Sequence, residues 1–300
     1  MTAVSKVTLN GTTLMDATTA TATASEIIAP YTAMTADGMM TTGTASGGGG
    51  DTLAQRATNT LVNYSSNDIT AVVAHLFNGC TALETVSLPN CSALADYAFN
   101  GCTNLESFSS TTNITNVGRA AFMNCSSMTS FPFDKLTGNA VNGSQDIFNG
   151  CSSLTKIYAP HATGVGGFTG TQFAYCTALV SARFPACTSA MRAGTFNGDS
   201  SLKLADLGSC SNIGSAGTIF NSCTNLEVLV LRKTSMAAVR SSEFANATNK
   251  IDVYVPSNLV STYQSGTNWS TLYANDKVQF LALENSPYEA TDFDDSAFFQ

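Results

Sequence analysis

Nine cysteines and two histidines are the side chains of this sequence that could bind a metal ion or take part in covalent catalysis. Zinc-binding cysteines usually occur as Cys-x-x-Cys pairs, and the serine of many hydrolases lies in the pattern Gly-x-Ser-x-Gly. Neither pattern occurs, and His75 and His161 are far apart in the sequence. The sequence therefore predicts no catalytic residue, no metal site and no cofactor.

The cysteines instead follow a repeat of the form Phe-x-x-Cys-x-x-Leu. Its copies start 22 to 26 residues apart, at Phe77, Phe99, Phe122, Phe148, Phe173, Phe196, Phe220 and Phe244. Six cysteines occupy the Cys position of the pattern, namely Cys80, Cys102, Cys125, Cys151, Cys176 and Cys223. Because the cysteines keep the period of the repeat and are odd in number, we interpret them as a buried ladder of unpaired thiols, with disulfide pairing as the alternative.

Two copies of the repeat lack the cysteine. Asp199 takes its place in the copy that starts at Phe196, and Ala247 takes its place in the last copy. A polar side chain at this position requires either local exposure to water or a hydrogen bond to a neighbouring turn.

A repeat of this length predicts a solenoid, in which each copy forms one coil that stacks on the next. Within a copy, a turn that carries Phe and Cys precedes a short strand, such as the one at 84–89. Alternation along that strand turns Val86 and Leu88 toward the interior and Ser87 toward the outside. We expect a mainly β fold, with a curved solenoid of eight repeats, a small N-terminal β/α module and a C-terminal cap.

Composition divides the chain into five segments. A turn signal at Asn10-Gly11 predicts a hairpin near the N-terminus, and four consecutive glycines predict a flexible joint further on. The predicted segments are a module at 1–45, a linker at 46–51, the solenoid at 52–256, a cap at 257–283 and an acidic tail at 284–300. Because the tail ends in two phenylalanines, it could dock on a neighbouring molecule.

Charge and hydropathy exclude some classes of partner. The net charge is −8, and the 13 lysines and arginines are scattered, which argues against binding to nucleic acid. No segment approaches the roughly 18 apolar residues of a membrane span. The first ten residues contain no apolar stretch of the kind found in secretory signals, so we expect no signal peptide and no membrane insertion.

The outward strand positions of successive coils should form rows on one face of the solenoid. The row in line with Ser87 comprises Ser87, Ser109, Pro132, Tyr158, Arg183, Asp206, Val230 and Tyr254. Aromatic residues and arginine are enriched in binding hot spots. The sequence therefore predicts a binding face made of Lys156, Tyr158, Arg183, Asp206 and Tyr254. The alternative is that these are ordinary strand-forming residues on a solvated sheet.

The segment Ala98-Phe99-Asn100-Gly101-Cys102-Thr103-Asn104-Leu105 resembles the BspA-type leucine-rich repeat, and the likeness extends over about residues 70–280. The stretch from Val253 to Tyr273 resembles the usual end of such arrays. The resemblance implies a curved leucine-rich-repeat solenoid that adheres to surfaces, proteins or glycans, and it implies no chemistry.

The N-terminal segment resembles a different family. Val7-Thr8-Leu9-Asn10-Gly11, then Thr23-Ala24-Ser25-Glu26-Ile27-Ile28 and Ala36-Asp37-Gly38, are similar to a small module of phage tail and fibre proteins. This resemblance implies that residues 1–45 anchor the chain to other virion proteins and help it to oligomerise.

Together, the two resemblances predict a structural protein of a phage virion, as a component of the tail, a fibre or the head decoration. It would present its repeat domain to a glycan or protein of the host surface. We expect it to be made in the host cytoplasm, to reside in the extracellular particle and to form a homo-oligomer such as a trimer. The alternatives are a virion component without a receptor role and a bacterial cell-surface leucine-rich-repeat adhesin.

Overall fold

The computed structural model describes residues 59–300, except 142–144, 166–169 and 215–216, together with four N-terminal strands. These strands are β1 (Lys6–Leu9), β2 (Thr12–Asp16), β3 (Thr32–Met34) and β4 (Met40–Thr42). β1 pairs with β2 and β3 pairs with β4, both antiparallel, which confirms the predicted hairpin around Asn10-Gly11. The helical part of the predicted β/α module and the linker at 46–51 lie outside the described residues.

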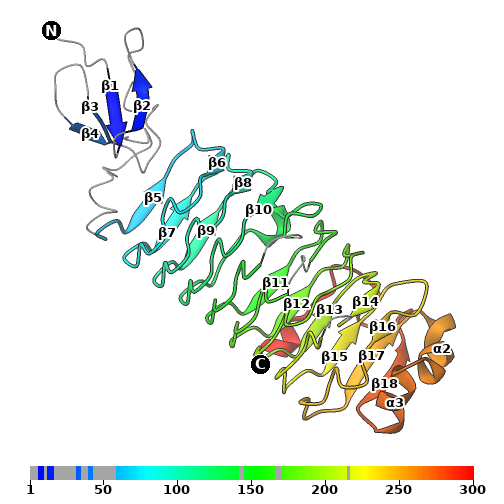
Figure 1. The fold of residues 1–300 in the computed structure, drawn as a ribbon. Helices are drawn as coiled ribbons and strands as arrows, with labels where there is room; N and C mark the ends of the chain where they lie inside the picture. The colour runs from blue at the N-terminus through cyan, green and yellow to red at the C-terminus, as the bar shows by residue number, and fades with distance from the viewer. Residues whose placement is uncertain are drawn as a thin grey trace.

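From residue 59 onward, successive coils stack into an elongated solenoid (Figure 1). Most coils contribute one strand to the same side of the array. These strands are β5 (Asn63–Ser65), β7 (Thr85–Ser87), β9 (Ser107–Ser109), β11 (Lys156–Tyr158), β12 (Ser181–Arg183), β13 (Leu204–Asp206), β15 (Val228–Val230) and β17 (Ile251–Val255). The predicted β-solenoid is thereby confirmed.

The strands form parallel sheets in register. One sheet has the order β5-β7-β9, and a six-stranded sheet has the order β11-β12-β13-β15-β17-β18. Between the two sheets, Ser130 continues the row through an isolated parallel bridge to Ser107. Shorter strands pair in the same way elsewhere in the coils, namely β6 (Ala71–Val72), β8 (Ala93–Leu94), β10 (Asn116–Val117), β14 (Asn212–Ile213) and β16 (Ala238–Val239).

Burial within a coil follows the predicted alternation. In β7, Val86 is buried, Thr85 is half-buried and Ser87 is exposed, while Leu88 is buried just beyond the strand. The eight repeat phenylalanines stack ring on ring, with centroids 5.0 to 5.9 Å apart from one coil to the next. Each coil therefore supplies the apolar surface that its neighbour needs, which is why the array is stable only as a stack.

All nine cysteines lie in the described part of the chain, are buried and form no disulfide bond. The thiol of Cys102 lies 2.9 Å from the backbone oxygen of Phe77 in the preceding coil and donates a hydrogen bond to it. Four further thiols repeat this contact one coil at a time, at Cys125, Cys151, Cys176 and Cys223. Burial raises the pKa of these four thiols well above the ordinary value. They therefore stay protonated and able to donate.

Asp199 is also buried, although it is ionisable. It accepts a hydrogen bond from the backbone nitrogen of Cys176 at 2.8 Å. The neighbouring turn, rather than exposure to water, therefore satisfies one oxygen of this carboxyl group, whereas its Oδ2 atom has no hydrogen-bond partner among the described residues. Burial raises its pKa well above the ordinary value for a carboxyl group, although that hydrogen bond acts in the opposite direction.

The segment predicted as a cap folds against the last coil. It comprises η3 (Ser257–Leu259), α2 (Val260–Ser265), α3 (Trp269–Ala274) and β18 (Val278–Ala282). Trp269 is fully buried, and its indole nitrogen donates to the backbone oxygen of Ala237 at 2.7 Å. β18 pairs in parallel with β17 and so adds one more strand to the large sheet. Among the described helices, none has both the length and the apolar character of a membrane span.

Candidate binding face

The outward side chains of the long strands form one continuous face, which divides into two halves. We call the first the open half; its residues are exposed or half-buried, namely Asn63, Ser65, Thr85, Ser87, Ser107, Ser109 and Ser130. We call the second the covered half; its central outward residues are buried, namely Ser181, Arg183, Leu204, Asp206, Val228 and Val230.

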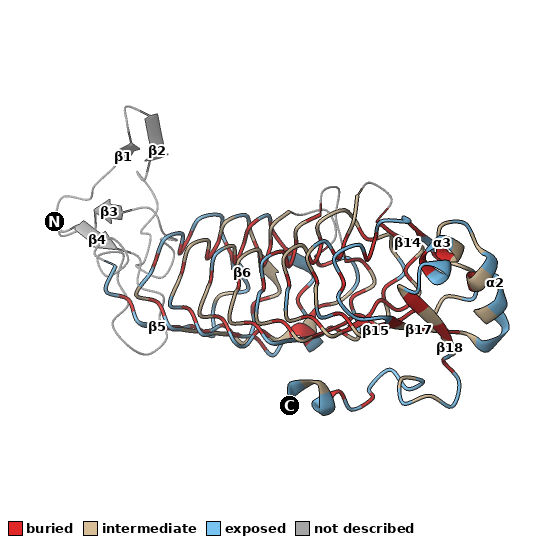
Figure 2. Ribbon diagram, turned by 90° about the horizontal axis from the view of Figure 1, so that it is seen from below, coloured by how far each residue is buried: buried red, intermediate tan, exposed pale blue. Residues whose placement is uncertain are grey.

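The tail, residues 284–300, covers the second half. Figure 2 shows the chain leaving β18 and running back along the side of the array that carries the long strands. It ends in the short helix η4 (Ser296–Phe299). The sequence predicted docking on a neighbouring molecule, but the tail lies on the sheet of its own chain.

An apolar strip holds the middle of the tail. Leu204, Val228 and Val230 point outward from β13 and β15 and pack with Leu283 and Phe293 in a cluster separate from the main core. The ring of Tyr288 in the tail packs edge-on against Tyr254, with the ring centroids 4.7 Å apart. Burying this strip removes apolar surface from water, which stabilises the docked tail.

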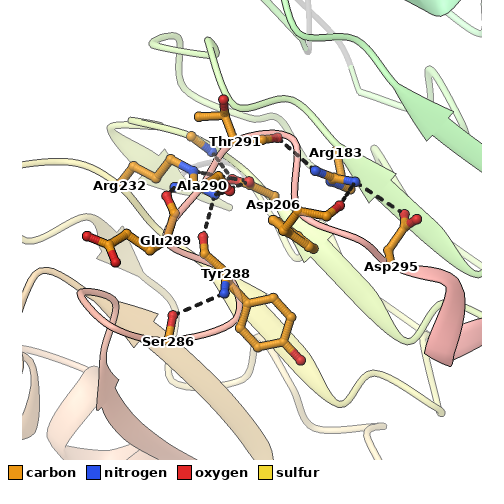
Figure 3. Close-up of polar contacts among 11 residues, drawn as sticks. Arg183, Asp206, Arg232, Ser286, Tyr288, Glu289, Ala290, Thr291 and Asp295 are labelled. Carbon is orange, nitrogen blue, oxygen red and sulfur yellow. Dashed lines mark hydrogen bonds and ion pairs between the residues drawn. The ribbon is translucent and has the colours of Figure 1, made fainter.

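Arg183 lies at the centre of the contact. Its guanidinium group is stacked between two rings, with the carbon atom 4.6 Å from the centre of the Tyr158 ring and 3.8 Å from that of Phe293. It donates hydrogen bonds to the backbone oxygens of Phe293 at 2.8 Å and Thr291 at 2.7 Å (Figure 3). A planar guanidinium suits this arrangement because it can stack and donate in its plane at the same time.

Arg232 forms a second fixed point. It pairs with the fully buried carboxylate of Asp206, with a nitrogen–oxygen distance of 2.7 Å. The same guanidinium donates to the backbone oxygens of three consecutive tail residues, namely Tyr288, Glu289 and Ala290 (Figure 3). Asp206 also accepts a hydrogen bond from the backbone nitrogen of Gly208, so the ion pair has a further contact outside the tail.

The acidic end of the tail meets the basic side chain of β11. Asp295 forms an ion pair with Lys156 and accepts a hydrogen bond from the hydroxyl of Ser181 at 2.7 Å. Burial alone raises the pKa of Asp295, but the hydrogen bonds from Lys156 and Ser181 and the charges of Lys156 and Arg183 outweigh it, so the pKa lies below the usual range. Asp295 therefore docks as a carboxylate.

The structure brings the five predicted binding residues together on one face, as the strand register requires. It does not leave them all open: Lys156 is exposed, Tyr158 and Tyr254 are half-buried, and Arg183 and Asp206 are 2% and 0% exposed. Arg183 and Asp206 are not open to solvent, because the tail covers them. Binding of a partner at these residues stays a prediction.

Sequence reasoning missed the residues that complete this contact. They are Ser181, Lys203 and Arg232 on the sheet side, and Tyr288, Phe293 and Asp295 in the tail. One signal was present: the run from Val228 to Leu231 is apolar at both inward and outward positions. Such runs are typical of strands that are covered on both faces.

Among the described residues, no group of three or more His, Cys, Asp or Glu side chains is placed to hold a metal ion. The comparison with protein families supports a repeat architecture. A family profile described as the BspA type Leucine rich repeat region matches in six copies, at residues 59–166 and 144–273. A comparison with curated proteins gave no match.

Three solved structures are similar to the chain. A leucine-rich repeat protein of T. pallidum is 23% identical, with a TM-score of 0.48 over 65% of this chain and 87% of that one. A leucine-rich repeat protein from Bacteroides ovatus is 15% identical, with a TM-score of 0.39 over 73% and 69%. A leucine-rich cell surface protein from Faecalibacterium prausnitzii is 14% identical, with a TM-score of 0.25 over 77% and 90%.

Proposed function

The chain belongs to the BspA-type leucine-rich repeat family, and we propose that it is an adhesion protein that binds a glycan or protein of a cell surface through the outer face of its solenoid. We assign it no enzymatic role. The observation that carries the proposal is the open half of that face, where seven outward Ser, Thr and Asn side chains stand in register on adjacent strands.

The open half suits a polar, uncharged ligand. Hydroxyl groups can donate and accept hydrogen bonds, and amide groups offer both functions side by side. Neighbouring strands are about 4.8 Å apart, so the rows present these groups at regular intervals. No described residue of the chain covers Ser87 or Ser109, both of which are exposed. A sugar chain could contact several rows at once, and many weak contacts would add up to adhesion.

Lys156, Tyr158, Arg183, Asp206 and Tyr254 form the other part of the proposed face. Arginine and tyrosine supply much of the binding energy of protein interfaces. Access to Arg183 and Asp206 requires the tail to move, whereas the open half is accessible in the structure as it stands.

The proposed carrier is a phage particle, in which the chain is part of the tail, a fibre or the head decoration. The resemblance of residues 1–45 to modules of phage tail and fibre proteins supports this placement, with those residues contacting other virion proteins and forming a homo-oligomer such as a trimer. The repeat family fits a bacterial cell surface equally well. Immunogold labelling with an antibody to the solenoid tests this placement. Gold on phage particles would support the virion, and gold on bacterial envelopes would contradict it in favour of a bacterial cell-surface protein.

Substitutions on the open half test adhesion. Ser87→Arg, Ser109→Arg and Ser130→Arg, combined in one protein, place bulky charged groups on the face without touching the core. We expect this variant to lose adhesion to host cells while it folds normally. Asn104→Arg, on an exposed turn of the same coil array, is the matched control. Undiminished adhesion of the triple variant would contradict the proposal, and a virion component without a receptor role would show no adhesion even before substitution.

A further inference from the structure

We infer that the covered half of the outer face is a binding site for an extended peptide segment of the pattern Tyr-x-x-x-x-Phe-x-Asp. The chain's own tail is its intramolecular occupant, and a segment of a partner protein competes with the tail for it. The inference rests on the proposed use of the outer face for binding, and it adds the chemical class of the ligand and the way access is controlled.

The tail is an addition to a solenoid that is already complete. The sheet continues without interruption from β11 to β18, and the cap containing Trp269 covers the last coil. Phe293 of the tail packs with Leu283, which directly precedes the tail, in a cluster apart from the main core. Among the described residues, no strand of the tail joins the sheet. Its contact with the face is therefore that of a ligand lying on a surface.

The basic residues of the face hold the tail mainly by its backbone. Arg183 donates to the backbone oxygens of residues 291 and 293, and Arg232 to those of residues 288–290. Lys203 donates to the backbone oxygen of Phe298 at 3.0 Å. Every peptide has such oxygens, so these contacts give affinity to an extended segment of any sequence.

Three tail side chains add selectivity. Tyr288 packs on Tyr254, Phe293 stacks on Arg183, and Asp295 pairs with Lys156. The side chains between them face solvent instead; Glu289, Asp292 and Asp294 are exposed. The spacing of the three anchors in the tail gives the pattern that we assign to the site.

One donor at the centre of the site remains unused. Arg183 is 2% exposed, and its Nε atom has no hydrogen-bond partner among the described residues. Leaving a buried donor unpaired is unfavourable. A partner segment that places an acceptor there would bind better than the tail does and could displace it.

The charge of the face also fits a protein segment with acidic residues. Four basic side chains of the face contact the tail, namely Lys156, Arg183, Lys203 and Arg232, in a chain with a net charge of −8, and Arg232 also pairs with Asp206. Opposite charge steers a partner to a surface and fixes its register.

The test uses the full chain with a protease site inserted between Asn285 and Ser286, so that the protein folds before its tail is cut. The probe is a fluorescent peptide with the sequence of residues 286–300. After cutting, we expect the original tail to dissociate and the labelled peptide to bind, whereas the uncut chain should bind it at least about tenfold more weakly. Near-identical binding to cut and uncut chains, or no exchange of the cut tail, would overturn the inference.

Peptide and face variants test which groups are read. Peptides carrying Phe293→Ala or Asp295→Asn should bind the cut chain about tenfold more weakly, as expected when a contact to a charged group is lost. The Asp292→Asn peptide is the matched control and should bind normally. Arg183→Ala in the cut chain should weaken binding by about ten- to a hundredfold. Equal affinity of all three peptides would show that the anchors are not read.

Two further results separate this inference from docking of a second copy's tail and from the proposed adhesion through the open half. Dimers of the uncut chain that fall apart on cutting would mean that the occupant is the tail of a second copy, which would overturn competition by a different protein. Peptide binding is measured in solution without cells. The triple variant of Ser87, Ser109 and Ser130 should lose adhesion but keep peptide binding, which would support both proposals separately. Normal adhesion together with failed peptide binding of the cut natural chain would overturn this inference alone.

Discussion

The open and covered halves of the outer face stand on the same frame but carry different side chains. At equivalent outward positions, the open half has Ser87 and Ser109, whereas the covered half has Arg183 and Val230. The inward residues at the centres of the strands are apolar and buried in both halves. The difference teaches that the interior determines the solenoid, while the outward row determines what lies against it: water in one half and the tail in the other.

The largest effects should come from the shared interior, and they should be the same in both halves. Leu105 and Leu226 occupy the last position of the repeat pattern in the two halves, and both are fully buried. Leu105→Ala and Leu226→Ala should each lower the free energy of unfolding by roughly 2–5 kcal/mol, through lost burial and a residual cavity. Chemical denaturation measures both. A clearly smaller cost in one half would break the idea of a uniform frame.

A buried acid should make the coils under the covered half sensitive to pH. Glu243 precedes a repeat phenylalanine, where the open half has Ala98, and burial raises its pKa to about 7 although two backbone N–H groups donate to it. A folded-state pKa above the unfolded value means that stability is lost as pH rises from about 4.5 to about 7. The loss should be on the order of 3 kcal/mol.

Thermal or chemical unfolding between pH 5 and pH 8 measures this dependence. Glu243→Gln keeps the shape of the side chain and removes its titration, so it should make the profile less steep over that range, while buried Asp199 still contributes. A profile of the Gln variant as steep as that of the natural chain would assign the pH dependence to other groups.

Outward positions should separate the two halves most clearly. Arg183→Ala removes two hydrogen bonds to tail oxygens and the ring contact with Phe293, so tail docking should weaken by roughly 1.5–3 kcal/mol. Ser87→Ala in the open half should change stability by less than about 0.5 kcal/mol. Hydrogen exchange of residues 286–300 follows the tail directly. If residues 286–300 were equally protected from hydrogen exchange in Arg183→Ala, Arg183 would not be the main residue that holds the tail.

The smallest effect concerns the acidic end of the tail. Because the folded-state pKa of Asp295 lies below its ordinary 3.8, its contribution to docking is present above that value and is lost as pH falls through the folded-state pKa. Acid should therefore loosen the tail, the opposite direction to the stabilising effect of acid on Glu243. In hydroxyl-radical footprinting, Phe293 should be modified faster at pH 3 than at pH 7. The Asp295→Asn variant should not show this difference.

The fold could be predicted from the sequence because it depends on the regular spacing of residues close together in the chain. The interval between phenylalanines gives the coil, and alternation around Val86 gives the inward and outward sides of each strand. The buried cysteines follow from the same period. The hydrogen bonds that their thiols donate to backbone oxygens needed the structure, because they depend on the stacking distance between coils.

The cover over half of the binding face could not be predicted in the same way. Arg183, Lys203 and Arg232 hold the tail mainly through its backbone oxygens. Every residue has a backbone oxygen, so the sequence does not indicate which ones accept these hydrogen bonds. Only the apolar outward residues, such as Val228 and Val230, indicated that something lies over these strands. The partner of such a surface is distant in sequence, so its identity follows from tertiary structure alone.

Hydroxyl-radical footprinting of the native chain tests the central claim, that the tail closes the covered half, most directly. Phe293 and Phe299 are the same residue type in the same tail, but they are 7% and 42% exposed. Their rates of modification can therefore be compared directly. We predict that Phe293 is modified as slowly as the core residue Phe99, while Phe299 is modified readily. Modification of Phe293 at the rate of Phe299 would show that the tail does not lie on the sheet and would contradict the account.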